Sequence, residues 1–196
     1  MLNNQLVRVR DNVSSAEYIE DIDDQPVNNY SYDAIGNLVR DSAEGISQIS
    51  WTVYGKIRQI TKRDGTVIQY RYDAAGNRIG KSVAKPSGTT AYTWYVRDAS
   101  GNVMSTYESS GTGESLPATL FQREVHLYGS SRIGIFNRWV DAKQGYAAPT
   151  VFSSYRGQKF FELSNHLGNV LATISDRKIG YSTGGINIDY YEADVI

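Results

Sequence analysis

The chain of 196 residues contains no cysteine, four prolines and two histidines. Without cysteine it can form no disulfide, no thiolate zinc site and no thiol nucleophile, and its redox compartment cannot be inferred. Its 20 Lys and Arg residues nearly balance its 21 Asp and Glu residues, which leaves a formal net charge of −1. Such a chain cannot neutralise a run of phosphates, so we expect no nucleic-acid partner.

Long hydrophobic runs are missing as well. No stretch approaches the roughly 20 consecutive apolar residues of a membrane span, so we expect none. The segment Met1-Leu2-Asn3-Asn4 does not have the form of a signal peptide, so any export signal is expected elsewhere. At roughly 150 residues per domain, the length corresponds to one large or two small units.

Tyrosine and glycine are abundant: the chain has 15 Tyr against 5 Phe, and 18 Gly. Aromatic residues suit strands and glycine suits turns, so this composition predicts a protein of sheets and turns. Evidence for a helix is limited to a capping-box pattern at Ser14-Ser15-Ala16-Glu17, which no sustained helical period follows.

One phrase recurs along the chain. Its copies are Tyr30-Ser31-Tyr32-Asp33-Ala34-Ile35-Gly36-Asn37, Tyr70-Arg71-Tyr72-Asp73-Ala74-Ala75-Gly76-Asn77, Tyr95-Val96-Arg97-Asp98-Ala99-Ser100-Gly101-Asn102 and the looser Asn165-His166-Leu167-Gly168-Asn169. About midway between the first two, Trp51-Thr52-Val53-Tyr54-Gly55-Lys56 has the form of a degenerate copy. A recurring phrase of this kind predicts a repeat architecture.

The spacing inside the phrase predicts a tight hairpin. Asp at the first position and Gly at the fourth are typical of a type I turn, in which the Asp carboxylate accepts a backbone hydrogen bond and Gly takes a positive φ. Asn at position 165 can replace Asp, since its side-chain oxygen accepts the same bond. Tyrosines two residues apart before the turn lie on one face of a strand. The residues assigned to this structural turn motif are Tyr30, Tyr32, Asp33, Gly36, Asn37, Tyr70, Tyr72, Asp73, Gly76, Asn77, Asp98, Gly101, Asn102, Asn165, Gly168 and Asn169.

These patterns predict an all-β fold of consecutive antiparallel β-hairpins. We divide the chain into an acidic N-terminal segment that begins the strip of strands (1–29), the repeats (30–107), a flexible loop rich in Ser, Gly and Thr (108–119) and a second β segment (120–196). Further strands are expected at 57–61, 66–72, 123–128, 131–139 and 171–175.

Candidate catalytic and metal sites are weak. Gly180-Tyr181-Ser182-Thr183-Gly184 matches the nucleophile elbow of serine hydrolases, but that motif needs a following helix and a later histidine. A strand-like run follows instead and both histidines precede it, so we favour a glycine-rich loop. The acidic run Asp21-Ile22-Asp23-Asp24 fails the EF-hand pattern, and we favour a solvated loop over a calcium site. His126 and His166 have no clustered third ligand.

Asp33, Asp73 and Asp98 are already explained as turn residues, which argues against their being catalytic acids. We therefore expect no enzyme, no cofactor and no metal site. The tyrosines leave a carbohydrate-binding surface open, because aromatic faces stack on sugars. We favour the alternative that their rings pack across strands while their hydroxyls reach water.

The phrase Tyr-x-Tyr-Asp-x-x-Gly-Asn resembles the YD repeat of the RHS (rearrangement hotspot) family, which occurs in large bacterial surface and secreted proteins and, more distantly, in the teneurins of animals. The stretches 95–103, 126–132 and 163–171 resemble the segment just before the RHS repeat-associated core, in wording closest to Bacteroidetes-type members. The resemblance extends over residues 30–176.

The resemblance implies a strip of hairpins that forms a curved fragment of a β-shell. In bacterial polymorphic toxins this shell encloses an effector, so the implied partner is a toxin domain or the rest of the shell, and the implied location is secreted or cell-surface. A glycan is the alternative partner, through a carbohydrate-binding or adhesion module. The chain has no Asp-Pro dipeptide, so we expect it to lie before the self-cleaving segment of many RHS cores. Open strand edges predict self-association or marginal stability of the isolated chain.

Overall fold

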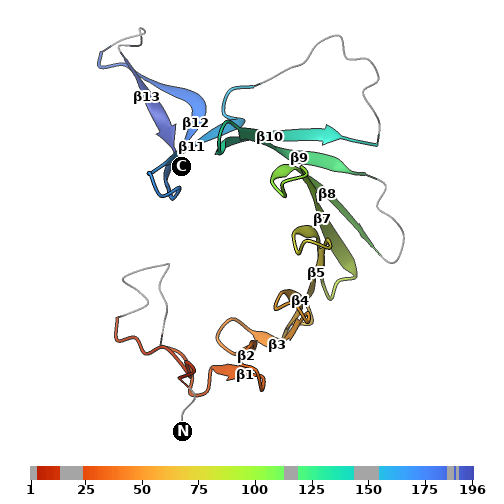
Figure 1. Cartoon of the computed structure of the whole chain (residues 1–196). Coiled ribbons are helices and arrows are strands. Elements are labelled where there is room, and N and C mark those ends of the chain that lie inside the picture. Colours follow the sequence, from red (N-terminus) through yellow and green to blue (C-terminus); the bar gives the residue numbers. More distant parts are fainter. Residues whose placement is uncertain (1–3, 14–23, 113–118, 144–154, 185–187, 189) are drawn as a thin grey trace. The chain divides into compact units, whose positions relative to one another are not determined.

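The structure is a computed structural model that describes residues 4–13, 24–112, 119–143, 155–184, 188 and 190–196. In this part of the chain there are thirteen strands and no helix. The strands form one sheet, in which each strand pairs with the next one along the sequence (Figure 1). The prediction of an all-β fold made of consecutive hairpins is therefore confirmed.

The strands are β1 (Tyr30–Tyr32), β2 (Leu38–Asp41), β3 (Ile46–Trp51), β4 (Ile57–Lys62), β5 (Val67–Tyr72), β6 (Arg78–Ala84), β7 (Thr89–Arg97), β8 (Val103–Thr112), β9 (Phe121–Tyr128), β10 (Arg132–Asp141), β11 (Lys159–Ser164), β12 (Val170–Tyr181) and β13 (Tyr190–Val195). None of the described segments forms a helix long and apolar enough to cross a membrane.

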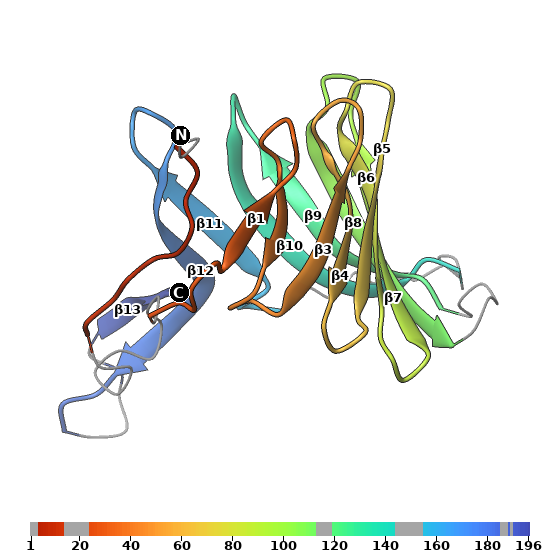
Figure 2. The same ribbon diagram turned by 90° about the horizontal axis from the view of Figure 1, so that it is seen from below.

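The chain divides into two compact units. The first comprises Met1–Tyr92 with Ser110–Ser115, and the second comprises Thr93–Ser109 with Leu116–Ile196. In the first unit, β3 and β4 pair antiparallel through Ile49 and Ile60, and Figure 2 shows β3, β4 and β5 as long neighbouring strands. In the second, β9 and β10 pair antiparallel, as do β11 and β12 and also β12 and β13.

The sheet has almost no conventional hydrophobic core. Among the described residues, Ile49 is the one hydrophobic side chain that is buried, at 5% exposure. Large apolar side chains such as Trp139 and Leu171 are well exposed, at 65% and 71%. A domain normally buries one face of its sheet against a second layer. The described strands have no such layer, so other interactions must hold neighbouring hairpins together.

The N-terminal segment differs from its prediction. Residues 4–13 and 24–29 contain no strand, and the sheet begins at Tyr30. Single backbone hydrogen bonds run there from the Gln25 N–H to the Val9 carbonyl, from the Tyr30 N–H to the Val7 carbonyl and from the Ser42 N–H to the Asn29 carbonyl, without forming a ladder. The expectation that residues 1–29 begin the strip as a strand is therefore wrong for these residues. The capping box at 14–17 and the acidic positions 21–23 lie outside the described residues.

The loop expected over 108–119 begins later than its composition indicated. Strand β8 continues through Thr112, and Glu108 pairs with Phe121 of β9. Ser, Thr and Gly favour loops, but pairing with a partner strand overrides such local preferences.

Candidate functional site: the repeated hairpin turn

The turn at Asp33 is closed by backbone and side-chain hydrogen bonds together. The Gly36 N–H donates to the Asp33 carbonyl (3.2 Å), and the Asp33 N–H donates to the Asn37 carbonyl (2.9 Å). Gly36 has φ +93°, a conformation that favours glycine. One carboxylate oxygen accepts the N–H groups of Ile35 and Asn37, at 3.0 and 2.8 Å. The other accepts the Asn37 side-chain amide at 2.9 Å.

The same arrangement recurs at other copies. The Asp73 carboxylate accepts the backbone N–H and the side-chain amide of Asn77, at 2.8 and 3.1 Å. The Asp98 carboxylate binds the same two groups of Asn102, at 2.8 and 2.9 Å. At the fourth copy, the side-chain oxygen of Asn165 accepts two backbone N–H groups. In these turns the first position is therefore held by an aspartate or an asparagine whose side-chain oxygen accepts backbone N–H groups.

The degenerate copy forms the same turn with different chemistry. The Thr52 hydroxyl accepts the Lys56 N–H at 3.1 Å, and the Gly55 N–H donates to the Thr52 carbonyl at 3.1 Å. Gly55 has φ +70°. The sequence placed the asparagine at the fifth position of the complete copies in the turn motif without indicating what its side chain binds. Its side-chain amide donates to the aspartate carboxylate. The sequence contains a sign of this contact: Asn stands at the fifth position of the turns that begin with Asp, and Lys stands there in the turn that begins with Thr.

In the first unit, a β-bulge directly precedes the turns that begin at Asp33, Thr52 and Asp73. The strand register shifts between Ser31 and Tyr32, between Ser50 and Trp51, and between Arg71 and Tyr72. A bulge is what a three-residue hairpin loop with a positive-φ glycine requires. It also increases the local twist and re-aims the aromatic side chain that precedes the turn.

Two of these aromatic side chains, Trp51 and Tyr72, link their hairpin to an earlier one. The Trp51 indole Nε1–H donates to the Leu38 carbonyl at 2.8 Å, and the Tyr72 hydroxyl donates to the Ile57 carbonyl at 2.8 Å. Leu38 and Ile57 occupy the same place, the first residue after the preceding turn. We call such a bond an aromatic rung. It satisfies a carbonyl at the point where a strand pair diverges into its loop.

Further rungs occur at both ends of the repeats. In the second unit the Tyr128 hydroxyl donates to the Val103 carbonyl at 3.0 Å, and Val103 is the first residue after the Asp98 turn. In the first unit the Tyr32 hydroxyl donates to the Leu6 carbonyl at 3.0 Å. The hydroxyls of Tyr32, Tyr72 and Tyr128 thus bind main-chain carbonyls, partners that the sequence did not predict. The sequence does mark two of these tyrosines by their position, because Tyr32 and Tyr72 directly precede the aspartate of a turn.

The turn hydrogen bonds lower the pKa of the turn aspartates. The Asn102 side-chain amide, followed by the Asn102 and Ser100 backbone N–H groups, holds the pKa of Asp98 below its ordinary value. For Asp33 the largest single influence is desolvation, which raises the pKa, but the bonds from Asn37 and Ile35 together outweigh it and the pKa falls. These carboxylates are therefore ionised turn formers at neutral pH.

The other candidate residues lie apart from one another in structural roles. His126 is buried, with Nε2 3.4 Å from the Glu124 carboxylate, and His166 lies in the Asn165 turn. The described residues include no group of three or more His, Asp or Glu side chains placed to hold a metal ion. Gly180 and Tyr181 end strand β12, and no helix follows in the described part, unlike the nucleophile elbow.

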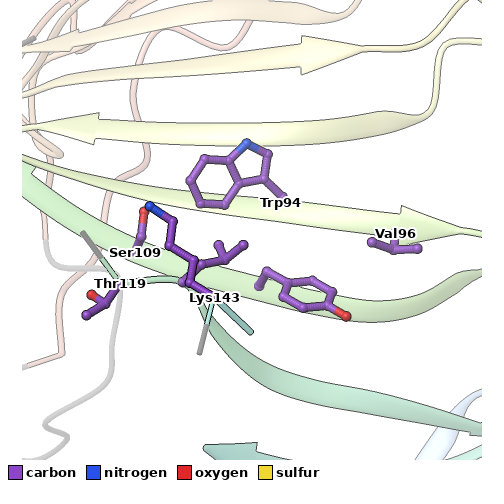
Figure 3. A pocket seen from close by; sticks show the side chains of 7 residues that line it. Trp94, Val96, Ser109, Thr119 and Lys143 are labelled. Carbon is purple, nitrogen blue, oxygen red and sulfur yellow. The ribbon is translucent and has the colours of Figure 1, made fainter. Parts of the chain in front are cut away.

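An apolar pocket of about 460 Å³ lies in the second unit, at the ends of β8 and β10 remote from the Asp98 turn (Figure 3). Its lining residues are Trp94, Val96, Tyr107, Ser109, Thr119, Leu120 and Lys143. Sequence reasoning missed this pocket, because its members come from four separate segments. A broader and more polar cleft of about 720 Å³ lies among the Asp98, Gly129 and Asn165 loops.

Alternating strands, bulged turns and aromatic rungs define a protein built from β-hairpin repeats. Residues 51–90 match the family model of the RHS repeat, a range that contains the turns at Thr52 and Asp73. The resemblance to the RHS/YD-repeat family inferred from the sequence is confirmed by this match over these residues.

No curated protein matches the chain. Fifteen chains of solved structures resemble it. Among them is the crystal structure of TcdB2-TccC3 without its hypervariable C-terminal region, with 15% sequence identity and a TM-score of 0.44. That match covers 77% of this chain, and this chain spans 7% of the length of the solved one.

Proposed function

We propose that the chain is a non-catalytic structural segment of an RHS/YD-repeat shell that encloses a toxin or effector in a secreted or cell-surface bacterial protein. The observation that carries the proposal is a sheet of consecutive hairpins in which a single described hydrophobic side chain is buried. A sheet with both faces uncovered is unusual for a self-contained domain. It is the expected state of a wall segment whose apolar faces meet other parts of a longer protein.

The aromatic rungs support the same role. A wall one layer thick cannot rely on a second layer for stability. Here the hairpins that turn at Thr52 and Asp73 are each tied to an earlier hairpin by such a hydrogen bond, Trp51 to Leu38 and Tyr72 to Ile57, in addition to the strand ladder. Because this device is local, it can be repeated over many hairpins, as a large shell requires.

The test uses photo-cross-linking in the full natural reading frame that contains the chain. Trp94 and Tyr95 are adjacent on β7, so their side chains point to opposite faces of the sheet. A photoreactive phenylalanine analogue at each position in turn should cross-link to the effector from one position and not from the other. Cross-links from neither position, or equally from both, would contradict enclosure by this wall.

A second candidate function, glycan binding or adhesion, is favoured by one observation. The rings of Tyr181 and Tyr190 stack at 5.4 Å between centroids and 9° between planes, and both are exposed. An exposed pair of aromatic rings is a surface on which a sugar can stack. Binding on a glycan array that is lost in Tyr181→Ala and retained in Tyr54→Ala would support it. Tyr54 is an exposed tyrosine of the Thr52 turn and serves as the matched control. Equal signals from both variants would dismiss it.

A further inference from the structure

Strands β3, β4, β5 and β6 of the first unit form a sheet whose two faces differ in chemistry. Cross-strand pairs join Ile49 to Ile60, Ile60 to Ile68 and Ile68 to Val83. Residues directly opposite one another on antiparallel strands point to the same face, so these side chains form one aliphatic row across all four strands. Ile49 is buried, and the other three are half-buried. We call the face that carries this row the aliphatic face.

The opposite face is polar. The adjacent register positions pair Ser50 with Gln59, Gln59 with Gln69 and Gln69 with Ser82. Because neighbouring residues on a strand point to opposite faces, this second row lies behind the aliphatic one. The Gln69 side-chain amide donates to the Gln59 side-chain oxygen at 3.0 Å, and the Gln59 amide donates to the Thr61 hydroxyl at 3.2 Å. These side chains satisfy one another, so the polar face needs no covering layer.

The aliphatic row, by contrast, calls for a partner. A sheet normally packs an apolar face against a second layer, whereas a polar face can remain in water. Ile60, Ile68 and Val83 each keep part of their surface accessible. Because burial of this remaining apolar surface is favourable, the aliphatic face is the one on which a second layer would pack.

A lysine stands on each side of this row. Lys62 follows Ile60 by two residues and Lys81 precedes Val83 by two residues, so both lie on the aliphatic face. The backbone N–H and the hydroxyl of Thr66 chiefly lower the pKa of Asp64 in the next turn, and the charge of Lys62 adds to this effect. Among the described residues the Lys81 ammonium makes no ion pair and no hydrogen bond.

The strands offer these lysines no acidic neighbour, since β3, β4, β5 and β6 contain no Asp or Glu. Lys81 lies directly opposite Tyr70 of β5. The Arg78 guanidinium lies over the ring of the same tyrosine, 4.3 Å from its centroid. The aliphatic face therefore combines an apolar row with positive charge, and it complements a surface that is apolar and acidic.

We propose that the aliphatic face of the first unit binds a polypeptide segment of the enclosed effector in which aliphatic side chains are flanked by Asp or Glu. The aliphatic side chains of that segment pack on Ile60, Ile68 and Val83, and a carboxylate pairs with Lys81. This inference rests on the proposed shell function and adds to it which face of the sheet meets the effector, and through what chemistry. A nucleic acid would satisfy the lysines but has no aliphatic side chains for the row.

Photo-cross-linking in the full natural reading frame compares the two faces at one place. Tyr70 and Gln69 are adjacent on β5 and point to the aliphatic and the polar face. Benzoylphenylalanine replaces each of them in turn, and at Tyr70 this change keeps an aromatic side chain. The yield of cross-links to the effector should be about fivefold or more higher from position 70 than from position 69, because only one of these side chains faces the effector. Mass spectrometry of the product should place the cross-link in an effector segment with aliphatic and acidic residues.

The possible outcomes separate this inference from the shell function. Equal yields from both positions, a larger yield from Gln69, or a cross-linked segment without acidic residues would overturn the inference and leave enclosure standing. Effector cross-links from Trp94 or Tyr95 alone would do the same. Cross-links from Tyr70 to nucleic acid in place of the effector would also overturn it. Absence of effector cross-links from all four positions would instead contradict the shell function.

The role of the charge is tested by Lys81→Gln. This change should lower the cross-link yield from Tyr70 about threefold or more, because it removes the attraction for a carboxylate. Arg71→Gln is the matched control, since it removes a charge from the polar face of β5, and it should leave the yield unchanged. An unchanged yield in Lys81→Gln, or equal losses in the two variants, would show that the lysine does not recognise the effector.

Discussion

The stabilising role of the aromatic rung can be tested by a substitution that removes a single oxygen atom. Tyr72 and Tyr70 both lie on β5, two residues apart and both partly exposed. The Tyr72 hydroxyl donates to the Ile57 carbonyl at 2.8 Å. Among the described residues the Tyr70 hydroxyl makes no hydrogen bond, and its ring lies under Arg78, 4.3 Å from centroid to guanidinium carbon. The substitutions Tyr72→Phe and Tyr70→Phe are therefore chemically identical and differ in one bond.

The expected cost follows from that bond. A hydrogen bond between uncharged groups contributes about 1 kcal/mol net, within a range of roughly 0.5–1.5 kcal/mol. Tyr72→Phe also leaves the Ile57 carbonyl without its partner, which places the cost toward the upper end. For a protein of this length, about 1 kcal/mol corresponds to a melting temperature lower by roughly 2–4 °C. Tyr70→Phe removes no bond, so its effect should stay within about 0.5 kcal/mol.

Urea denaturation followed by tryptophan fluorescence measures both variants. Trp51 belongs to the neighbouring rung and reports on the same unit. The midpoint should fall in Tyr72→Phe with an unchanged slope, because the surface exposed on unfolding does not change. Equal midpoints for the two variants, or a larger loss in Tyr70→Phe, would refute the idea that rungs hold the hairpins together.

Three further predictions concern the turns and the edge. Gly76→Val should destabilise by about 1–2 kcal/mol more than Ala75→Val, because Gly76 has φ +80°, which strains the backbone of any residue with a Cβ. A Cβ at this position would contact nothing closer than Lys56 Cε at 3.7 Å. Similar melting temperatures for the two variants would contradict this. The lowered pKa of Asp98 stabilises the fold above its unfolded value near 3.8, and this contribution disappears as pH falls through the folded pKa. The difference in unfolding free energy between wild type and Asp98→Ala should therefore shrink from pH 7 to pH 3, and a constant difference would speak against it. Strand β13 ends the described sheet, so the chain should associate with increasing concentration in sedimentation experiments; a monomer at all concentrations would argue against an open edge.

Local chemistry explains which parts of the structure the sequence could predict. The turn between Asp73 and Gly76 is formed by neighbouring residues alone, so the turn, the positive φ of its glycine and the flanking strands can be predicted from a short stretch of sequence. The rung from Tyr72 to Ile57 depends on a bulge that rotates the tyrosine and on a strand 15 residues earlier. The strand propensity of tyrosine predicts that it lies on a strand but does not predict which group its hydroxyl binds.

The pocket was beyond sequence reasoning for a related reason. Its unpartnered hydroxyl belongs to Ser109, in a stretch whose Ser and Gly content predicted a loop. Only the pairing of β8 with β9 extends the strand far enough to bury that side chain. The N-terminal segment shows the opposite error, because Val7 and Val9 resemble strand residues but have no partner strand that would propagate a ladder.

The adjacency of tyrosine and aspartate in the repeat has a physical reason. A hairpin cut from a single-layer sheet leaves unsatisfied N–H groups inside its loop and a weakly held carbonyl where the strands separate. Asp73 satisfies the first need, since its carboxylate binds the Asn77 backbone and side-chain amide. Tyr72, turned by the bulge, satisfies the second on the neighbouring hairpin at Ile57. Two consecutive residues thus close one turn and fasten it to the preceding one. Because neither interaction needs a buried core, a sheet of such repeats can be extended hairpin by hairpin without a second layer.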